Sequence, residues 1–300
     1  MSGDVSPFDI RDRMTVDAIV DDGRLAALTT WNGLPCQCFL GIPFTKLSFD
    51  DVLDLVAERP ADSPFAYLST PNSTLVTFFN QDRPGVAEGL ANAWILSCDG
   101  RVVRRVASML FGIWLPLIAG SDFTEELFRK VIKPTDRITI IGGNEALAEA
   151  LRTKFNLAGV SFYSPPFGFS RDPKELDRCA EFIRENPARF VFLACGAPQS
   201  ELLGAHMVRT GGATGVGLCI GASLMFVTGQ MQRAPRILQD MGLEWLHRLL
   251  GEPRRMSRRL IDGQLPFLWL AFRARLSGKI TGLQAPRFVR IRPLGASRHS

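Results

Sequence analysis

Residues 137–163, RITIIGGNEALAEALRTKFNLAGVSFY, indicate the fold of this chain more clearly than any other stretch. A strand is expected at 137–141, followed by a Gly-Gly turn, a helical stretch at 144–155 and a second strand at 160–163. Parallel strands need a helical crossover of this kind between them. The unit therefore predicts an α/β fold with a Rossmann-like, doubly wound and mainly parallel sheet.

The same alternation extends outward in both directions from this unit. Further strands are expected at 65–69, 94–98, 190–195 and 213–220. Helical stretches separate them, and Ser48 begins one that runs through Val56. Three parts follow from this pattern: a variable leader without clear periodicity (1–37), an α/β core (38–252), and a basic helical appendage (253–300).

The positive charge of the chain is concentrated in that appendage. The whole chain carries a formal charge of +5, and residues 253–300 contain ten arginines, one lysine and a single acid, a local balance of +10. A mildly acidic body with a basic tail indicates a polyanionic partner for the tail, either a membrane surface or a nucleic acid.

Residues 265–279, LPFLWLAFRARLSGK, place a Trp-containing apolar block next to arginines. Such a block is typical of an interfacial membrane element, although a terminal helix docked on the core with a solvated basic face would give the same pattern. The aromatic side chains could also stack on nucleobases. Because the cations bracket a compact apolar block and do not form a stripe, a lipid partner is favoured over a nucleic acid.

Several classes of protein lack support in this sequence. The six cysteines form no CxxC pair, the N-terminus does not resemble a signal peptide, and no apolar run approaches the ~18 residues that a membrane-spanning helix needs. We therefore expect reduced core cysteines and a cytoplasmic protein. The sequence contains no DxD motif and no clustered histidines, so a metal site is not expected. It also contains no P-loop, GxSxG or GxGxxG motif, so a hydrolase or a dinucleotide-dependent oxidoreductase lacks support.

Candidate functional residues lie in the loops that follow the expected strands, where ligands bind in open parallel sheets. These loops are 69–72, 97–100, 142–144 and 196–201, together with Gly221 after the last strand. Each leads into a helix N-terminus, whose N–H groups suit phosphate. Asp99 follows an apolar strand and precedes Gly100, which suits a general base, although an N-cap of the next helix is the competing interpretation.

Ordered motifs through residues 38–260 give the chain a family resemblance. They are T-x-N at 70–72, DG at 99–100 followed by Val102 and Val103, GG at 142–143, PPFGF at 165–169, GAPQSE at 196–201, GASLMFVTG at 221–229, RAP at 233–235, GLEWLHRL at 242–249 and EPRR at 252–255. This series resembles the WecG/TagA/CpsF glycosyltransferases (glycosyltransferase family 26).

The resemblance implies an inverting, metal-independent glycosyltransferase without a cofactor, acting in exopolysaccharide, capsule or other cell-surface polysaccharide synthesis. It implies a UDP-sugar donor and a polyprenyl-diphosphate-linked saccharide acceptor at the inner face of the cytoplasmic membrane, where the protein would be peripherally bound, with no nucleic-acid partner. Asp99 and Thr70 would be catalytic. The residues expected to bind substrate are Asn72, Gly142, Gly143, Gly196, Pro198, Gln199, Glu201, Gly221, Arg233, Arg254, Arg255 and Arg258.

The chain departs from the family pattern at three positions. Ser200 stands where glutamine is usual, Gln199 where a basic residue is usual, and Met225 where an acid is typical. Without a metal, the charge of a departing UDP would have to be stabilised by arginines such as Arg233 and the 254–259 cluster. A homo-oligomer is compatible with the sequence, and the alternative function is a peripheral membrane or nucleic-acid-binding protein acting through its basic tail.

Overall fold

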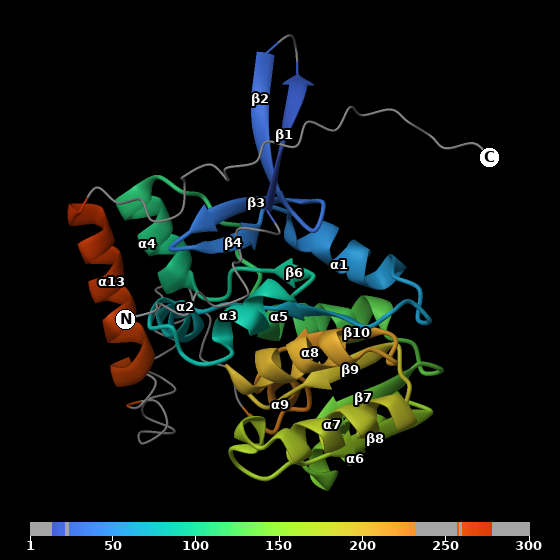
Figure 1. Ribbon diagram of the computed structural model, residues 1–300. Helices are drawn as coiled ribbons and strands as arrows, with labels where there is room; N and C mark the ends of the chain where they lie inside the picture. The colour runs from blue at the N-terminus through green and yellow to red at the C-terminus, as the bar shows by residue number, and fades with distance from the viewer. Residues whose placement is uncertain (1–13, 22–23, 232–256, 258–259, 278–300) are drawn as a thin grey trace.

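A six-stranded parallel sheet forms the centre of the protein (Figure 1). The structure, a computed structural model, describes residues 14–21, 24–231, 257 and 260–277. The strands of this sheet are β5 (Ala66–Ser69), β6 (Ile95–Leu96), β7 (Arg137–Ile141), β8 (Gly159–Tyr163), β9 (Phe190–Leu193) and β10 (Val216–Cys219). Every pairing among them is parallel. The predicted α/β, Rossmann-like fold is confirmed.

The strand order, β6-β5-β10-β9-β7-β8, contains two points where the chain reverses its direction of growth. The chain leaves β5 for β6 on one side, and β10 returns to the other side of β5. In the same way β7 leads to β8 on one side, and β9 returns to the other. Ligands of open α/β sheets bind at the carboxyl ends of strands that flank such switch points.

Helices cover both faces of the sheet, because the strands are apolar on both sides. Val191 and Leu193 belong to one buried cluster, and their neighbours Phe190 and Phe192 to the other. The first face carries α2 (Ser73–Asn80), α3 (Val86–Ala91), α4 (Arg101–Phe111), α7 (Pro173–Glu185), α8 (Gln199–Thr210) and α13 (Leu265–Leu276). The second carries α1 (Phe49–Glu58), α5 (Gly120–Glu126), the π-helical turn η2 (Leu127–Val131), α6 (Glu145–Phe155) and α9 (Ser223–Val227).

Local sequence signals fix the starts of several helices. Ser48 and Asp51 form a capping box at α1, in which each side chain accepts a hydrogen bond from the backbone N–H of the other. Asn144 caps α6, and Asp172 caps α7 with Pro173 at its first position. These helices begin within a residue or two of where the sequence predicts.

A second, antiparallel sheet occupies the N-terminal part, where the sequence predicted a leader without periodicity. Its strands are β1 (Met14–Asp21), β2 (Arg24–Trp31), β3 (Leu34–Phe39) and β4 (Ile42–Thr45), in that order across the sheet. β1 and β2 project from the body (Figure 1). Buried Trp31 donates a hydrogen bond from Nε1 to the Ala93 carbonyl at 3.0 Å, and Thr45 Oγ1 accepts one from Leu96 N at 3.1 Å. The small sheet is thereby anchored beside edge strand β6.

The described part of the predicted appendage packs on the core. The short turn η4 (Leu260–Gln264) and α13 both contact α2, and α13 also contacts α4. Phe267 is fully buried, and the Gly263 carbonyl accepts a hydrogen bond from Thr77 Oγ1 at 2.9 Å. Residues 260–277, part of the predicted appendage (253–300), therefore pack on the first face of the core, as the alternative of a docked terminal helix predicts.

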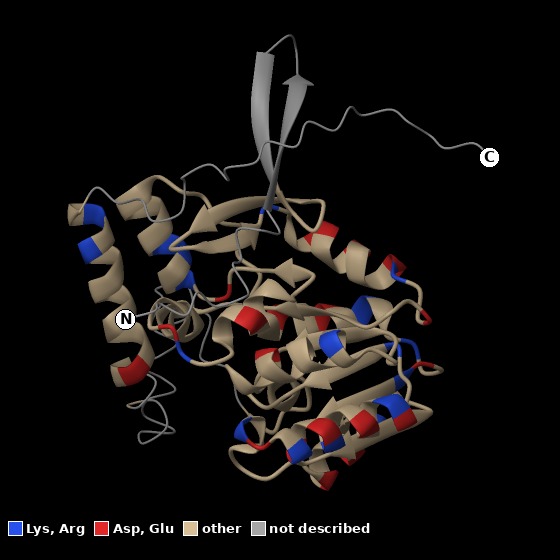
Figure 2. Cartoon of the chain, viewed as in Figure 1, with Lys and Arg blue, Asp and Glu red and all other residues tan. Residues whose placement is uncertain are grey.

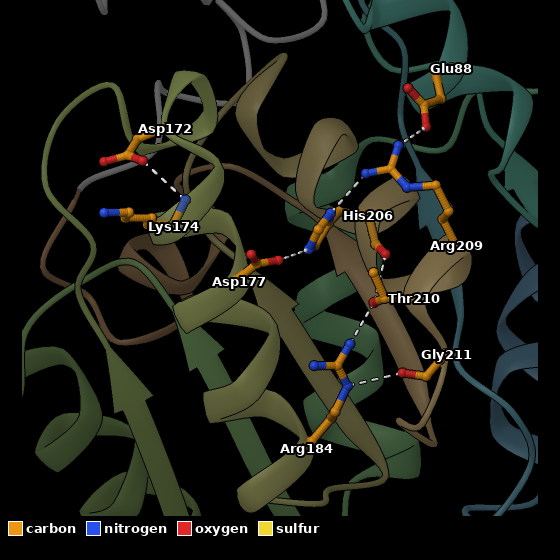
Figure 3. Close-up of polar contacts among 9 residues, drawn as sticks. All are labelled: Glu88, Asp172, Lys174, Asp177, Arg184, His206, Arg209, Thr210 and Gly211. Carbon is orange, nitrogen blue, oxygen red and sulfur yellow. Dashed lines mark hydrogen bonds and ion pairs between the residues drawn. The ribbon is translucent and has the colours of Figure 1, made fainter.

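A chain of polar contacts ties α8 to its neighbours on the first face (Figure 3). His206 Nε2 lies 2.9 Å from Asp177 on α7, and Arg209 contacts both His206 Nδ1 (3.0 Å) and Glu88 on α3 (2.7 Å). At the end of α8, Arg184 donates to the Gly211 carbonyl at 3.0 Å. Exposed ion pairs add little stability, so the main effect of this network is to orient α8 between α3 and α7.

All six cysteines are free thiols, and five of them are buried. Burial raises the pKa of Cys36, Cys179 and Cys195 to about 12 and that of Cys38 to about 11. Thiols of this kind behave as small apolar side chains.

Candidate active site

The loops that follow β5 and β6 are joined at the carboxyl edge of the large sheet. Ser97 N donates a hydrogen bond to the Ser69 carbonyl at 3.0 Å, and Asp99 N donates to the Pro71 carbonyl at 3.1 Å. On the other side, Ile118 N donates to the Cys98 carbonyl at 3.0 Å. The backbone of Asp99 is therefore held against the 70–72 loop.

Asp99 is half-buried and does not occupy the N-cap position of the following helix. That position belongs to Gly100, whose φ of 104° is available to glycine and whose lack of a side chain rules out a side-chain cap. The competing interpretation of Asp99 as the N-cap residue of α4 is therefore not what the structure has. Its backbone lies just after β6 and beside the 70–72 loop, where a general base would be needed.

Thr70 bridges the ends of β5 and β10. Its Oγ1 donates a hydrogen bond to the Cys219 carbonyl at 3.3 Å, and the side chain is 8% exposed. Gly120, at the start of α5, packs against it: a Cβ at Gly120 would lie 3.4 Å from Thr70 Oγ1. The hydroxyl thus lies at the first switch point, with one face covered by a glycine.

Asn72 caps α2, which is the structural role that its residue type suggests. Its Oδ1 accepts hydrogen bonds from Thr74 N at 3.0 Å and Leu75 N at 3.2 Å. Because the cap engages Oδ1, the Nδ2 amide is the group through which Asn72 could donate to a substrate. Its predicted part in substrate binding stays a prediction.

The Gly142-Gly143 turn ends β7 in a backbone conformation that only glycine adopts readily. Its φ values are 103° and 74°, and a Cβ at Gly142 would lie 3.0 Å from the Ala194 carbonyl group. Ser164 Oγ also donates to the Gly143 carbonyl at 2.7 Å. The turn therefore brings the ends of β7, β8 and β9 together in front of the N-terminus of α6.

The loop after β9 leads directly into α8. Gly196 has a φ of 80°, and a Cβ there would meet no heavy atom of the described residues within 4 Å. Pro198 is the N-cap residue of α8, and Gln199 follows at its first position. Ser200 is buried and donates from Oγ to the Leu193 carbonyl at 2.7 Å. The Ser200 side chain therefore stabilises the loop between β9 and α8. The glutamine that is usual in the family at this position is a larger side chain.

Glu201 lies beneath the site rather than at its surface. The side chain is 3% exposed, and Oε1 accepts a hydrogen bond from Ser69 Oγ at 2.9 Å. Oε2 is buried without a hydrogen-bond partner among the described residues. Burial raises the pKa of this carboxyl from 4.5 to about 7. As placed here, Glu201 supports the residue that precedes Thr70, and direct contact with a substrate, as predicted, is untested.

Gly221 completes the first switch point from the β10 side. Its φ is 55°, and a Cβ there would meet no described heavy atom within 4 Å. Thr70 and Gly221 thus follow β5 and β10, while Gly142 and Gly196 follow β7 and β9. Four of the predicted residues therefore flank the two switch points. Met225, in α9, is partly buried and packs against the core of the second face.

The predicted arginines Arg233, Arg254, Arg255 and Arg258 lie outside the described residues. Within the described ranges, no three His, Cys, Asp or Glu side chains are grouped to hold a metal ion. No helix in these ranges has the length and apolar character needed to cross a bilayer.

The structure adds two residues that the sequence did not single out. Gly120 lies beside the Thr70 hydroxyl although it is fifty residues away, and the sequence carries no signal for this proximity. Phe167, in the loop after β8, is fully exposed at the carboxyl edge of the sheet. The PPFGF motif marks this loop but not the exposure of its aromatic ring.

An open parallel sheet with a carboxylate, a hydroxyl and glycine turns at two switch points defines a Rossmann-like α/β protein with a ligand site at its carboxyl edge. Residues 37–281, more than half of the chain, match the glycosyl transferase WecG/TagA/CpsF family. The chain belongs to this family, and it is a glycosyltransferase. The match extends past residue 260, where the resemblance was expected to end, and includes α13.

Proposed function

We propose that the protein transfers a sugar from a UDP-sugar to a polyprenyl-diphosphate-linked saccharide in the synthesis of a cell-surface polysaccharide, with inversion and without a metal. The observation that carries this proposal is the Asp99–Pro71 backbone bond of 3.1 Å, which holds the Asp99 loop against the loop of Thr70. A base and a hydroxyl at one switch point suit attack of an acceptor hydroxyl on a bound sugar.

In the proposed reaction, Asp99 accepts the proton of the acceptor hydroxyl as its oxygen bonds to the anomeric carbon. The bond between that carbon and the UDP oxygen breaks, and the electron pair leaves with UDP. A positioned base contributes about 10²–10⁴ in rate. Thr70, fixed by its bond to the Cys219 carbonyl, orients the donor or acceptor.

The charge that develops on UDP needs stabilisation. The Gly142-Gly143 turn precedes α6, and the 196–199 loop precedes α8, so N–H groups at two helix N-termini lie at the second switch point. The arginines Arg233, Arg254, Arg255 and Arg258 are proposed to supply the remaining positive charge. Together these groups would replace the metal that many glycosyl transfers use.

Turnover of UDP-sugars tests this function. We expect UDP release that depends on a polyprenyl-diphosphate-saccharide acceptor, and an Asp99→Asn variant that binds the donor but releases UDP at least 100-fold more slowly. Asp54→Asn, an exposed carboxylate on α1, is the matched control. Full turnover by the Asp99→Asn enzyme would remove Asp99 as the base, and no acceptor-dependent UDP release by the wild type would remove the proposed reaction.

A further inference from the structure

Large exposed apolar side chains are concentrated on two neighbouring helices. Of the ten in the described residues, nine lie on α4 and its following turn or on η4 and α13, and only Phe167 lies elsewhere. The nine are Met109, Leu110, Trp114, Ile261, Leu265, Leu268, Trp269, Phe272 and Leu276. Exposed apolar groups scattered singly need no explanation, but a cluster of this size marks an interaction surface.

The two helices form one continuous surface. α13 contacts α4, and the two lie side by side at one edge of the molecule (Figure 1). The Phe39 ring packs edge-on against Phe111 of α4, with centroids 5.4 Å apart, and against Phe267 of α13, 6.4 Å apart. The end of α4 that carries Met109 and Leu110 is thereby joined to α13.

α13 is apolar on both its inner and its outer side. Phe267, Ala271 and Ala274 are buried against the core, while Trp269 is 60% exposed and its ring stacks near that of Phe272 at 6.1 Å. Residues 265–272, which precede Arg273 and Arg275, are apolar all round, and a helical segment of this kind belongs in a protein interior or in lipid. The core covers only its inner side, so the outer side needs a second apolar environment.

The two helices of this surface carry only positive charge, while the turn η4 before α13 adds one exposed acid, Asp262. α4 carries Arg101, Arg104 and Arg105, α13 carries Arg273 and Arg275, and neither helix contains an acidic residue (Figure 2). The Arg104 guanidinium lies 4.0 Å from the centre of the Trp114 ring. Tryptophan, aliphatic side chains and arginine together are typical of groups that enter the interface of an anionic bilayer.

We propose that α4 and α13 form a single docking face for an anionic lipid surface, in which Met109, Leu110 and Trp114 of the α4 segment insert beside Leu268, Trp269 and Phe272 of α13. The face depends on α4 as much as on the basic C-terminal part. α4 begins at Arg101, immediately after Asp99-Gly100, and its eleven residues span about 16 Å. One helix thus connects the lipid surface to the candidate base.

This arrangement deepens the proposed function and rests on it in one respect: a lipid-linked acceptor would be presented along α4 towards Asp99. The docking itself needs no turnover and can be measured alone. The two ideas can therefore fail independently.

Co-sedimentation of the full chain with vesicles tests the docking face. Wild type should bind vesicles of phosphatidylglycerol and phosphatidylcholine, and bind pure phosphatidylcholine more weakly. Met109→Ser/Trp114→Ser should lower the partition coefficient at least about tenfold, as should Leu268→Ser/Trp269→Ser, because 1.4 kcal/mol is a factor of ten and burying one large apolar side chain exceeds it. The Phe167→Ser variant changes the exposed apolar side chain outside the face, and it should bind vesicles as wild type does.

Two results would overturn the proposal. The first is unchanged vesicle binding by the folded α4 variant, with an unchanged circular dichroism spectrum. The second is a wild-type dimer by light scattering that the α4 variant converts to a monomer without loss of vesicle binding, since the face would then join two copies of the chain.

In turnover assays, the α4 variant should lose activity on acceptor embedded in vesicles and keep it on a short-chain acceptor in solution. If wild type turns over neither acceptor but the variants still lose vesicle binding, the proposed function fails and the docking face stands.

Discussion

Replacing Glu201 by glutamine should stabilise the protein at neutral and alkaline pH, and the size of the effect should depend on pH. The Glu201 carboxyl is buried, with one oxygen bonded to Ser69 and the other without a partner among the described residues. Burial disfavours the charged form and raises the pKa from 4.5 to about 7. Glutamine has the same shape and stays neutral at every pH.

The magnitude follows from linkage between protonation and folding. Because the folded protein holds this proton more tightly than the unfolded chain, the stabilisation from Glu201 is fully present below pH 4.5 and is lost as the pH rises to about 7. A shift of this size corresponds to ~3 kcal/mol, most of which is lost between pH 5 and pH 8. Above pH 8 the loss is constant.

The assay is urea denaturation of wild type and Glu201→Gln at pH 5, 6, 7 and 8, with the free energy of unfolding compared at each pH. Taking the difference between the two proteins cancels the other titrating groups that they share. Glu185→Gln, an exposed carboxylate on α7, controls for the removal of one negative charge. We expect the Glu201→Gln protein to gain on wild type steadily from pH 5 to 8.

A difference between the two proteins that stays constant with pH would refute the reasoning, because the carboxyl would then titrate alike in the folded and unfolded chains. A difference of the opposite slope would mean that an unseen cation stabilises the Glu201 carboxylate. In either case the buried acid beneath the Thr70 loop would need another explanation.

Three further predictions concern the site. Asp99→Asn should lower kcat by about 10²–10⁴ and leave donor KM within a few-fold, measured as initial rates; a large KM effect alone would indicate binding and not proton transfer. Thr70→Val should cost about 1 kcal/mol of stability, through loss of the bond to the Cys219 carbonyl, and reduce kcat/KM, whereas Thr70→Ser restores both; equal behaviour of the two variants in urea denaturation and rate assays would argue against a role for the hydroxyl. Gly142→Ala should destabilise by about 1–3 kcal/mol, because φ is 103° and the new Cβ would lie 3.0 Å from the Ala194 carbonyl; an unchanged thermal midpoint would contradict this.

The large sheet was predictable because its strands are buried on both faces. Largely apolar stretches such as those at 138–141 and 190–193 indicate buried strands, and the helices between them carry clear caps at Asn144 and Asp172. Once these strands run parallel, their following loops must meet at one edge. The grouping of Asp99, Thr70 and the glycine turns followed from that rule.

The N-terminal sheet was missed although residues 14–21 alternate between apolar and polar apart from Ile19, whereas residues 24–31 show no such alternation. Alanines and threonines are mixed with apolar residues there, although Asp22-Gly23 between the two runs is a signal for a hairpin. Such strands gain their stability from pairing with each other and from the docking of Trp31. The Trp31 contact joins residues 62 positions apart in the sequence and leaves no periodic pattern.

Contacts between distant segments account for the remaining differences. The sequence predicts Glu201 to bind substrate in the loop at 196–201, and the packing of α8 against β5 buries its side chain. The composition of the tail allowed two interpretations of residues 265–276, a helix docked on the core and a lipid-binding helix. In the structure, α13 has a side buried against the core and an exposed apolar side. The neighbouring helix α4 contains three arginines, so its composition does not reveal the exposed apolar side chains at its C-terminal end.

The inert thiols make this protein convenient for site-directed labelling. At pH 7 a thiol with a pKa of about 12 is a thiolate in only roughly one molecule in 10⁵, so maleimides and spin-label reagents should pass over residues such as Cys36 and Cys179. A single cysteine introduced at Met109, which is 81% exposed, would then react selectively without a cysteine-free background. A fluorophore placed there would report the polarity around the end of α4 in solution and on vesicles.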